Sequence, residues 1–228
     1  MEKLINKLGI EFGDEELLKK ALTHRSYLNE SNLLESNERM EFLGDAVIEL
    51  VVSSYLYGKY VGEQEGILTN YRSALVKTET LANCARKLRL GEELKMSKGE
   101  EQNNGRENTS LLANTFEAVM GAIYLDQGIG SVELVLHKVL LPELEEIIRS
   151  KSYVDFKSKL QAVVQERMKV TPTYKVTKEV GPDHDKLFYV TCRAGRTELG
   201  KGEGKSKQHA EQAAAEESLR KLEIIPKG

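Results

Sequence analysis

The sequence predicts a multi-domain fold in which an all-α domain is followed by a small α+β domain with the element order α-β-β-β-α. Three observations support this prediction. Apolar residues recur at three- and four-residue spacing through the first 149 residues, which contain no proline before Pro142. The spacing then changes to the two-residue alternation that is typical of half-buried strands. The charge changes as well, from 17 basic against 25 acidic residues over 1–149 to 16 against 11 over 150–228.

We therefore expect domains over 1–149 and 153–224, joined by a short polar linker at 150–152 that permits relative movement. A basic domain attached to an acidic one fits a polyanion-binding unit joined to a cation-dependent site. Chance variation in solvated surface charge would give the same imbalance, so charge alone does not decide the function.

Helical spacing in the first domain predicts helices that include residues 14–22, 38–57, 67–88, 111–125 and 132–148. Asp14 is the expected N-cap of the first of these. Gly9, Gly91 and Gly128 stand where helix ends are expected. The segment 97–108 is polar and contains glycine, which predicts an exposed loop.

The second domain is expected to begin with a helix over 156–168. Alternating residues predict strands around 174–176 and 188–192. A third strand over 197–200 should lead into a glycine-rich turn, and the alanine-rich stretch 206–222 predicts the closing helix.

Composition narrows the class of protein. No signal peptide is recognisable, and the longest apolar stretch, 46–57, is shorter than the ~20 residues that a membrane helix needs. We therefore expect a soluble cytoplasmic protein with no membrane partner. The two cysteines are far apart and the four histidines are scattered, so neither a disulfide framework nor a zinc site is expected. A metal site would have to use oxygen ligands, which favours Mg²⁺ or Mn²⁺.

Acidic residues gather on one predicted helix. Glu38, Glu41 and Asp45 follow one another at spacings of three and four, which places them on one helical face. A second predicted helix offers Asn114 and Glu117 inside an otherwise apolar run. If the two helices face each other, oxygen-bearing side chains converge, and a divalent cation is the usual means of stabilising such a cluster. Taken alone, each helix also fits an amphipathic helix with a solvated acidic face.

Several segments together resemble one family. The string NERMEFLGDAV at 37–47 resembles the signature of the ribonuclease III family. The segments ALTHRSY at 21–27, EG at 65–66 and LLANTFEAVMGAIYLD at 111–126 match other segments of that family in order and approximate spacing. The α-β-β-β-α unit is similar to its double-stranded RNA-binding domain. The resemblance therefore covers essentially the whole chain.

The resemblance implies a homodimeric endoribonuclease that hydrolyses phosphodiester bonds of double-stranded RNA and leaves 5′-phosphate and 3′-hydroxyl ends. Its expected substrates are ribosomal RNA precursors and structured messenger RNA. Glu41, Asp45, Asn114 and Glu117 would surround Mg²⁺, with Mn²⁺ as a substitute, and Glu41, Asp45 and Glu117 would be catalytic. Two ions about 4 Å apart would serve the in-line displacement.

Three further positions follow from the resemblance. Glu38 and Glu65 would lie further along the same acidic valley, as a second acidic cluster. Phe42 would enter a cavity of the partner subunit at the dimer interface, unless it is an ordinary core residue.

The chain departs from the family at position 114, where aspartate is usual and this sequence has asparagine. An amide oxygen still binds Mg²⁺, but the site loses one formal negative charge and its metal affinity should fall. An active enzyme is our hypothesis, because Glu41, Asp45 and Glu117 remain. The alternative is a cleavage-impaired dimer that binds double-stranded RNA.

Three places in the second domain resemble the RNA-contacting regions of the family. The resemblance implies RNA contacts from Gln161, from His184 in the loop 181–184, and from Lys205 and Lys207 at a helix start. Such domains recognise A-form RNA by shape, through phosphates and 2′-hydroxyls, which disfavours a DNA nuclease. An exposed histidine and lysines that only solvate a helix remain the plain alternatives. Where the family usually has glutamate and a second lysine, this chain has Ala162 and Gln208, so we expect modest affinity and a shallow salt dependence.

Overall fold

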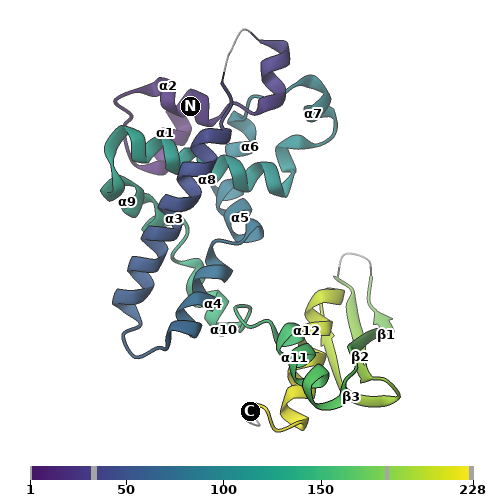
Figure 1. The fold of residues 1–228 in the computed structure, drawn as a ribbon. Coiled ribbons are helices and arrows are strands. Elements are labelled where there is room, and N and C mark those ends of the chain that lie inside the picture. Colours follow the sequence, from purple (N-terminus) through teal and green to yellow (C-terminus); the bar gives the residue numbers. More distant parts are fainter. Residues whose placement is uncertain (1, 32–34, 183–184, 226–228) are drawn as a thin grey trace. The chain divides into compact units, whose positions relative to one another are not determined.

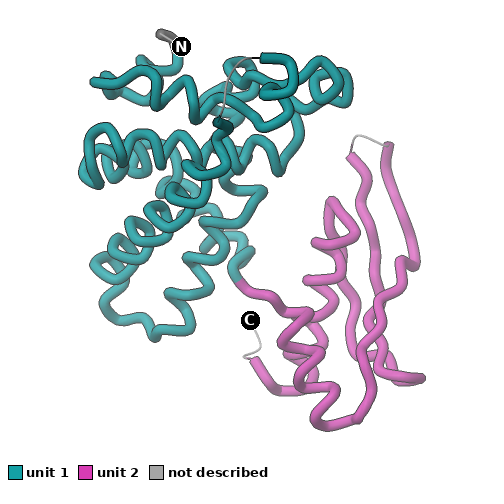
Figure 2. The backbone as a smooth tube through the Cα atoms, turned by 45° about the horizontal axis from the view of Figure 1, so that its top comes forward, with its two compact units in different colours: residues 1–153 teal, residues 154–228 magenta. Residues whose placement is uncertain are grey.

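The computed structural model describes residues 2–31, 35–182 and 185–225, and the chain forms two compact units, 1–153 and 154–228 (Figure 2). The first unit is helical and the second combines helices with a sheet (Figure 1). Within the described ranges, no helix is both long and apolar enough to cross a membrane.

The helices of the first unit follow one another with short connections. In chain order they are α1 (Glu2–Leu8), α2 (Glu15–Ala21), η1 (Arg25–Glu30), α3 (Glu38–Lys59), α4 (Glu65–Leu75), α5 (Thr78–Leu88), α6 (Leu90–Glu93), α7 (Lys98–Gln102), η2 (Gly105–Glu107), α8 (Thr109–Gln127), α9 (Ile129–Val139) and α10 (Glu143–Arg149). Asp14 caps α2 as predicted, since its side chain accepts a hydrogen bond from the backbone N–H of Glu16 (2.9 Å).

Helix α8 lies at the centre of this unit and packs most extensively against α3 (Figure 1). Two glycines allow the helices to touch. A Cβ atom on Gly44 would lie 1.8 Å from the backbone oxygen of Glu117, and one on Gly121 would lie 2.3 Å from the backbone oxygen of Met40. The backbones therefore meet more closely than any residue with a side chain would permit.

Two predicted helices are each divided in the structure. The stretch 67–88 covers most of α4 and all of α5. It is broken between them because Lys77 is extended and the hydroxyl of Thr80 donates to the backbone oxygen of Ala74 (2.9 Å). The stretch 132–148 breaks before α10, where Pro142 has no backbone N–H to donate and instead precedes the new helix.

The segment 97–108 is not a plain loop, because it holds α7 and η2. The side chain of Ser97 caps α7 by accepting from the backbone N–H of Glu100 (3.2 Å). The guanidinium of Arg106 donates to the backbone oxygen of Gly91 (2.7 Å). Gly91 itself lies inside α6 rather than at a helix end, and Arg89 provides the left-handed residue that ends α5.

The second unit consists of α11 (Phe156–Met168), β1 (Pro172–Val180), β2 (Leu187–Ala194), β3 (Thr197–Gly204) and α12 (Lys207–Lys221). The strands form an antiparallel sheet in the order β1-β2-β3. Both helices pack on one face of it, around a core that includes Leu160, Val190 and Leu219 (Figure 1).

The predicted glycine-rich turn after residue 200 is strand, because β3 continues to Gly204. These glycines instead allow β3 and α12 to pack closely. A Cβ atom on Gly202 would lie 2.2 Å from the backbone nitrogen of Ala214, so small residues on both sides let α12 lie directly on the sheet.

The α3–α8 contact predicts different effects for two glycines of α3. Gly44→Ala should lower the free energy of unfolding by about 2 kcal/mol or more, because the added methyl group meets backbone that cannot turn aside. Gly58→Ala is the matched control, since a Cβ there has no neighbour within 4 Å. That variant should be neutral or slightly stabilising. Equal denaturation midpoints for both variants would contradict the close contact.

Candidate active site and nucleic-acid interface

The contact between α3 and α8 determines where the acidic side chains lie. Glu41 and Asp45 flank Gly44 on α3, and Glu117 supplies the backbone oxygen that Gly44 touches on α8. Asn114 lies one turn earlier on α8, and its amide forms a hydrogen bond with the carboxylate of Glu41. The structure thus brings these four sequence-predicted residues to one place.

Burial and like charge perturb this cluster. Burial raises the pKa of Glu117 to about 7, and the charges of Asp45 and Glu41 add to the rise. Burial also raises the pKa of Glu41, helped by the charges of Glu38 and Asp45, whereas the hydrogen bond from Asn114 lowers it. The carboxylates are thus partly desolvated and repel one another, and a cation between them would oppose both rises because it favours the ionised forms.

The donor set fits a hard divalent cation in its chemistry, because all four side chains offer oxygen. In the part of the chain that the structure describes, however, no three Asp, Glu, His or Cys side chains lie in positions that would enclose an ion by themselves. Mutual repulsion of carboxylates favours such separation. The side chains of Glu41, Asp45 and Glu117 would have to turn inward before they could share one.

The two remaining acidic residues lie apart from each other. Glu38 is exposed at the start of α3, and its carboxylate pairs with Arg25 (3.5 Å). Glu65 begins α4, after the end of α3, and accepts a hydrogen bond from the hydroxyl of Thr69 (3.1 Å). Because α3 has 22 residues and rises about 1.5 Å per residue, roughly 30 Å separates its two ends. Within one chain, Glu38 and Glu65 do not form a common cluster.

Arg25 was not singled out from the sequence, although the segment ALTHRSY contains it. With His24 and Ser26 it lines a polar hollow that also reaches Asn108 and Ser110, at the start of α8. Burial lowers the pKa of His24. The hollow therefore lies beside the helix that carries Asn114 and Glu117.

Phe42 is exposed, which rules out a core position within this chain. Its side chain is 81% exposed, and Leu50 and Tyr57 on the same helix are 55% and 79% exposed. These residues lie at spacings of eight and seven, so they share one side of α3 with the exposed Ala46. Such an apolar stripe on a helix is typical of an interaction surface.

In the second unit the predicted RNA contacts come from separate elements. Gln161 is exposed on α11 and lines a shallow hollow with Gln208 of α12. Lys205 and Lys207 are exposed and pair with carboxylates, Lys205 with Asp185 (3.1 Å) and Lys207 with Glu179 (3.8 Å). His184, the remaining predicted contact, lies outside the described residues.

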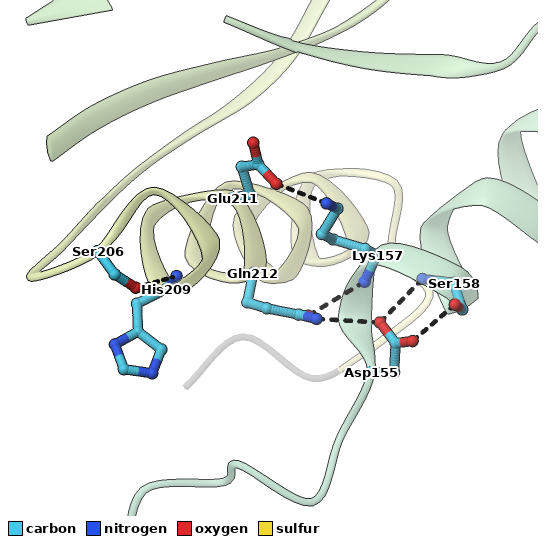
Figure 3. A network of polar contacts seen from close by, with 7 residues as sticks. All are labelled: Asp155, Lys157, Ser158, Ser206, His209, Glu211 and Gln212. Carbon is cyan, nitrogen blue, oxygen red and sulfur yellow. Dashed lines mark hydrogen bonds and ion pairs between the residues drawn. The ribbon is translucent and has the colours of Figure 1, made fainter. Parts of the chain in front are cut away.

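A hydrogen-bond network joins the two helices that carry these residues (Figure 3). The side chain of Gln212 on α12 donates to Asp155 (3.0 Å) and accepts from the backbone N–H of Lys157 (3.2 Å). Asp155 in turn caps α11 by accepting from Ser158, and the ammonium of Lys157 donates to Glu211 (2.5 Å). The network fixes the start of α11 against α12.

Glu117 should make stability depend on pH. Its pKa is raised in the folded chain, so its contribution to stability is full below pH 4.5 and is lost as the pH rises through about 7. In the presence of a chelator, Glu117→Gln should therefore raise the free energy of unfolding at pH 8.5, by about 1 kcal/mol after allowance for partial solvation, and leave it unchanged at pH 4. Glu133→Gln on the surface of α9 is the control and should have no effect at either pH. A Glu117→Gln effect of equal size at both pH values would disprove the interaction.

Comparisons with known proteins agree with these two units. Residues 14–144 match the family described as Ribonuclease-III-like, and residues 156–222 match the double-stranded RNA binding motif. Ribonuclease 3 of Caldanaerobacter subterraneus is 45% identical over 97% of this chain and 98% of its own length. Ribonuclease 3 of Lactococcus lactis subsp. cremoris is 44% identical over 96% and 95%.

Solved structures show the same fold for the first unit. The nuclease domain of ribonuclease III from Campylobacter jejuni, in a structure that describes flexibility in the region involved in dimer formation, is 41% identical. It superposes with a TM-score of 0.58 and covers 62% of this chain and 98% of its own. From two matching domains in the same order and relatives that match over nearly their full length, the chain belongs to the ribonuclease III family of double-strand-specific endoribonucleases.

Proposed function

We propose that this chain hydrolyses double-stranded RNA with Mg²⁺ as its cofactor and leaves 5′-phosphate and 3′-hydroxyl ends. The observation that carries the proposal is the meeting of α3 and α8, which gathers Glu41, Asp45, Asn114 and Glu117 at one place. Bound Mg²⁺, with Mn²⁺ as a substitute, would stabilise negative charge on the phosphate and on the attacking and leaving oxygens.

The role of each of the four residues would follow from the chemistry of its side chain. Glu41, Asp45 and Glu117 would hold the cation through carboxylate oxygens, and Asn114 through its amide oxygen. Glu117 is the most buried of the carboxylates, and its raised pKa keeps a proton available near neutral pH while the cation is absent. Occupation of the site should release that proton, because a neighbouring positive charge favours the ionised form.

The second unit would grip the duplex. Lys205 and Lys207 lie at the start of α12, where free backbone N–H groups also favour phosphate, and Gln161 faces outward from α11. Asp185 and Glu179 compete with phosphates for the two lysines. Because that competition offsets part of the gain, the unit should bind RNA modestly.

The salt dependence of RNA affinity tests the proposed lysine–phosphate contacts. Lys207→Ala should reduce the slope of log affinity against log salt concentration by about 1, since one phosphate contact is lost. Lys221→Ala at the other end of α12, where the lysine pairs with Glu217 (3.1 Å), should leave the slope unchanged. Fluorescence anisotropy with a labelled RNA duplex measures both slopes. An equal reduction of the salt slope in both variants would show that the start of α12 contacts RNA phosphates no more than its other end does.

We further propose that two chains form a homodimer through the exposed stripe on α3, with Phe42 inserted into the partner. A dimer would also explain Glu38 and Glu65, which lie at opposite ends of α3, because a shared acidic cluster would have to draw one of them from each chain. Two active sites in one valley could then each cut one strand of the duplex.

Replacing Phe42 tests the interface. Phe42→Asp should give monomers at micromolar concentration, because a charge would have to be buried at the contact. Phe42→Leu retains apolar character and should remain dimeric. Sedimentation velocity distinguishes the two states. A dimeric Phe42→Asp variant with wild-type stability would exclude this surface.

Asn114 sets the choice between an active nuclease and a protein that binds RNA without cutting it. Asn114→Asp adds a charge beside Glu41, so the half-saturating Mg²⁺ concentration for cleavage should fall severalfold. The assay uses a long RNA duplex with and without Mg²⁺, and duplex DNA as a competitor that should bind poorly. Mg²⁺-dependent short products from the wild-type chain support the nuclease. Products from Asn114→Asp alone would favour the binding protein.

We propose that the natural substrates are ribosomal RNA precursors and structured messenger RNA, which contain long duplexes, and that the enzyme acts on them in the cytoplasm.

A further inference from the structure

The stretch between the two units is ordered on both sides of a single residue. On the first side, residues 150–152 follow α10 and form its C-terminal cap. Lys151 has a left-handed backbone (φ +54°), its N–H donates to the backbone oxygen of Ile148 (3.1 Å), and the N–H of Ser152 donates to that of Ile147 (3.1 Å). This pair of bonds is the Schellman arrangement that closes a helix. The segment that the sequence suggested as a linker thus belongs to the first unit.

Tyr153 then attaches the chain to the core of the first unit. Its ring meets the ring of Tyr71 edge-on, with centroids 4.7 Å apart. Tyr71 is buried and meets Tyr60 in the same way, at 5.4 Å. Aromatic pairs in this arrangement gain energy beyond the area that they bury.

On the side of the second unit, fixed contacts begin directly after Val154. Asp155 caps α11 and accepts a hydrogen bond from Gln212 of α12 (Figure 3). Phe156 packs against the core of the second unit. From 150 to 156, a stretch that the structure describes in full, Val154 is the one residue that neither caps a helix nor packs in one of the two cores.

The chain therefore passes from one core to the other in very few residues. Tyr153 belongs to the first core and Phe156 to the second. Three residues span at most about 11 Å when fully extended. If Tyr153 and the cap at 150–152 came loose, the fixed ends would be Arg149 and Phe156, and the seven steps between them would reach about 25 Å.

We infer that the two units pivot about Val154, and that Tyr153 is a positioning residue that keeps the tether short. The inference rests on the proposed function in one respect: a short tether holds the RNA-binding unit at a high effective concentration over the duplex that the nuclease unit cuts. Effective concentration falls as a tether lengthens beyond the distance that it must span. A tether of one free residue would also restrict where the cut falls relative to the RNA grip.

Proteolysis at Lys151 tests the anchor without any RNA. A protease cuts only chain that can unfold locally, and Lys151 is exposed but held in the helix cap. A lysine-specific protease should cut full-length Tyr153→Ala after Lys151 at least about fivefold faster than the wild type, as read from fragment masses. Tyr153→Phe keeps the ring contact and should match the wild type. Equal rates in the wild type and in Tyr153→Ala would overturn the anchor.

A second variant avoids any loss of folding. Inserting Gly-Ser-Gly-Ser between Val154 and Asp155 leaves both cores intact and lengthens the tether. On a hairpin duplex with one preferred cut site, the insertion and Tyr153→Ala should both spread the products over neighbouring positions and lower kcat/KM severalfold at low RNA concentration. Unchanged products and rates in both variants would overturn the positioning role. If no variant cuts RNA, the proposed function fails, and the protease rates still decide whether Tyr153 anchors the chain.

Discussion

The close contact between α3 and α8 is the constraint on which the site depends. Gly44 and Gly121 let the two backbones touch, and a side chain at either position would separate them. That contact brings carboxylates from two helices toward one place, although they repel one another and two of them, Glu41 and Glu117, are partly buried. The packing energy of α8, whose residues from Leu112 to Ile123 are mostly buried, offsets this electrostatic cost.

Asn114 changes the balance of that cluster. An aspartate there would add a fourth carboxylate, whereas the amide donates a hydrogen bond to Glu41 and lowers its pKa. The asparagine should therefore favour the protein without bound metal and weaken its hold on a cation. Stability and metal affinity thus oppose each other at this position, as is common where charged groups gather for function.

The sequence predicted most of this architecture where local signals and packing agree. The spacing of Glu41 and Asp45 on α3 and the cap at Asp14 follow from residue types alone. The break at Lys77 could not be foreseen, because apolar spacing continues across it and neither glycine nor proline marks it. The glycines of β3 favour a turn when the sequence is considered alone, because only the packing of α12 reveals that they allow close contact. Likewise, the exposure of Phe42 and the distance between Glu38 and Glu65 depend on tertiary structure, which helical spacing does not contain.

Direct observation of a bound ion would test the central claim. Crystals grown with Mn²⁺ should give one or more anomalous peaks between α3 and α8, within coordination distance of oxygens from Glu41, Asp45 and Glu117, whose side chains would have turned inward. Peaks only elsewhere, or no peak at a Mn²⁺ concentration that supports cleavage, would contradict the account.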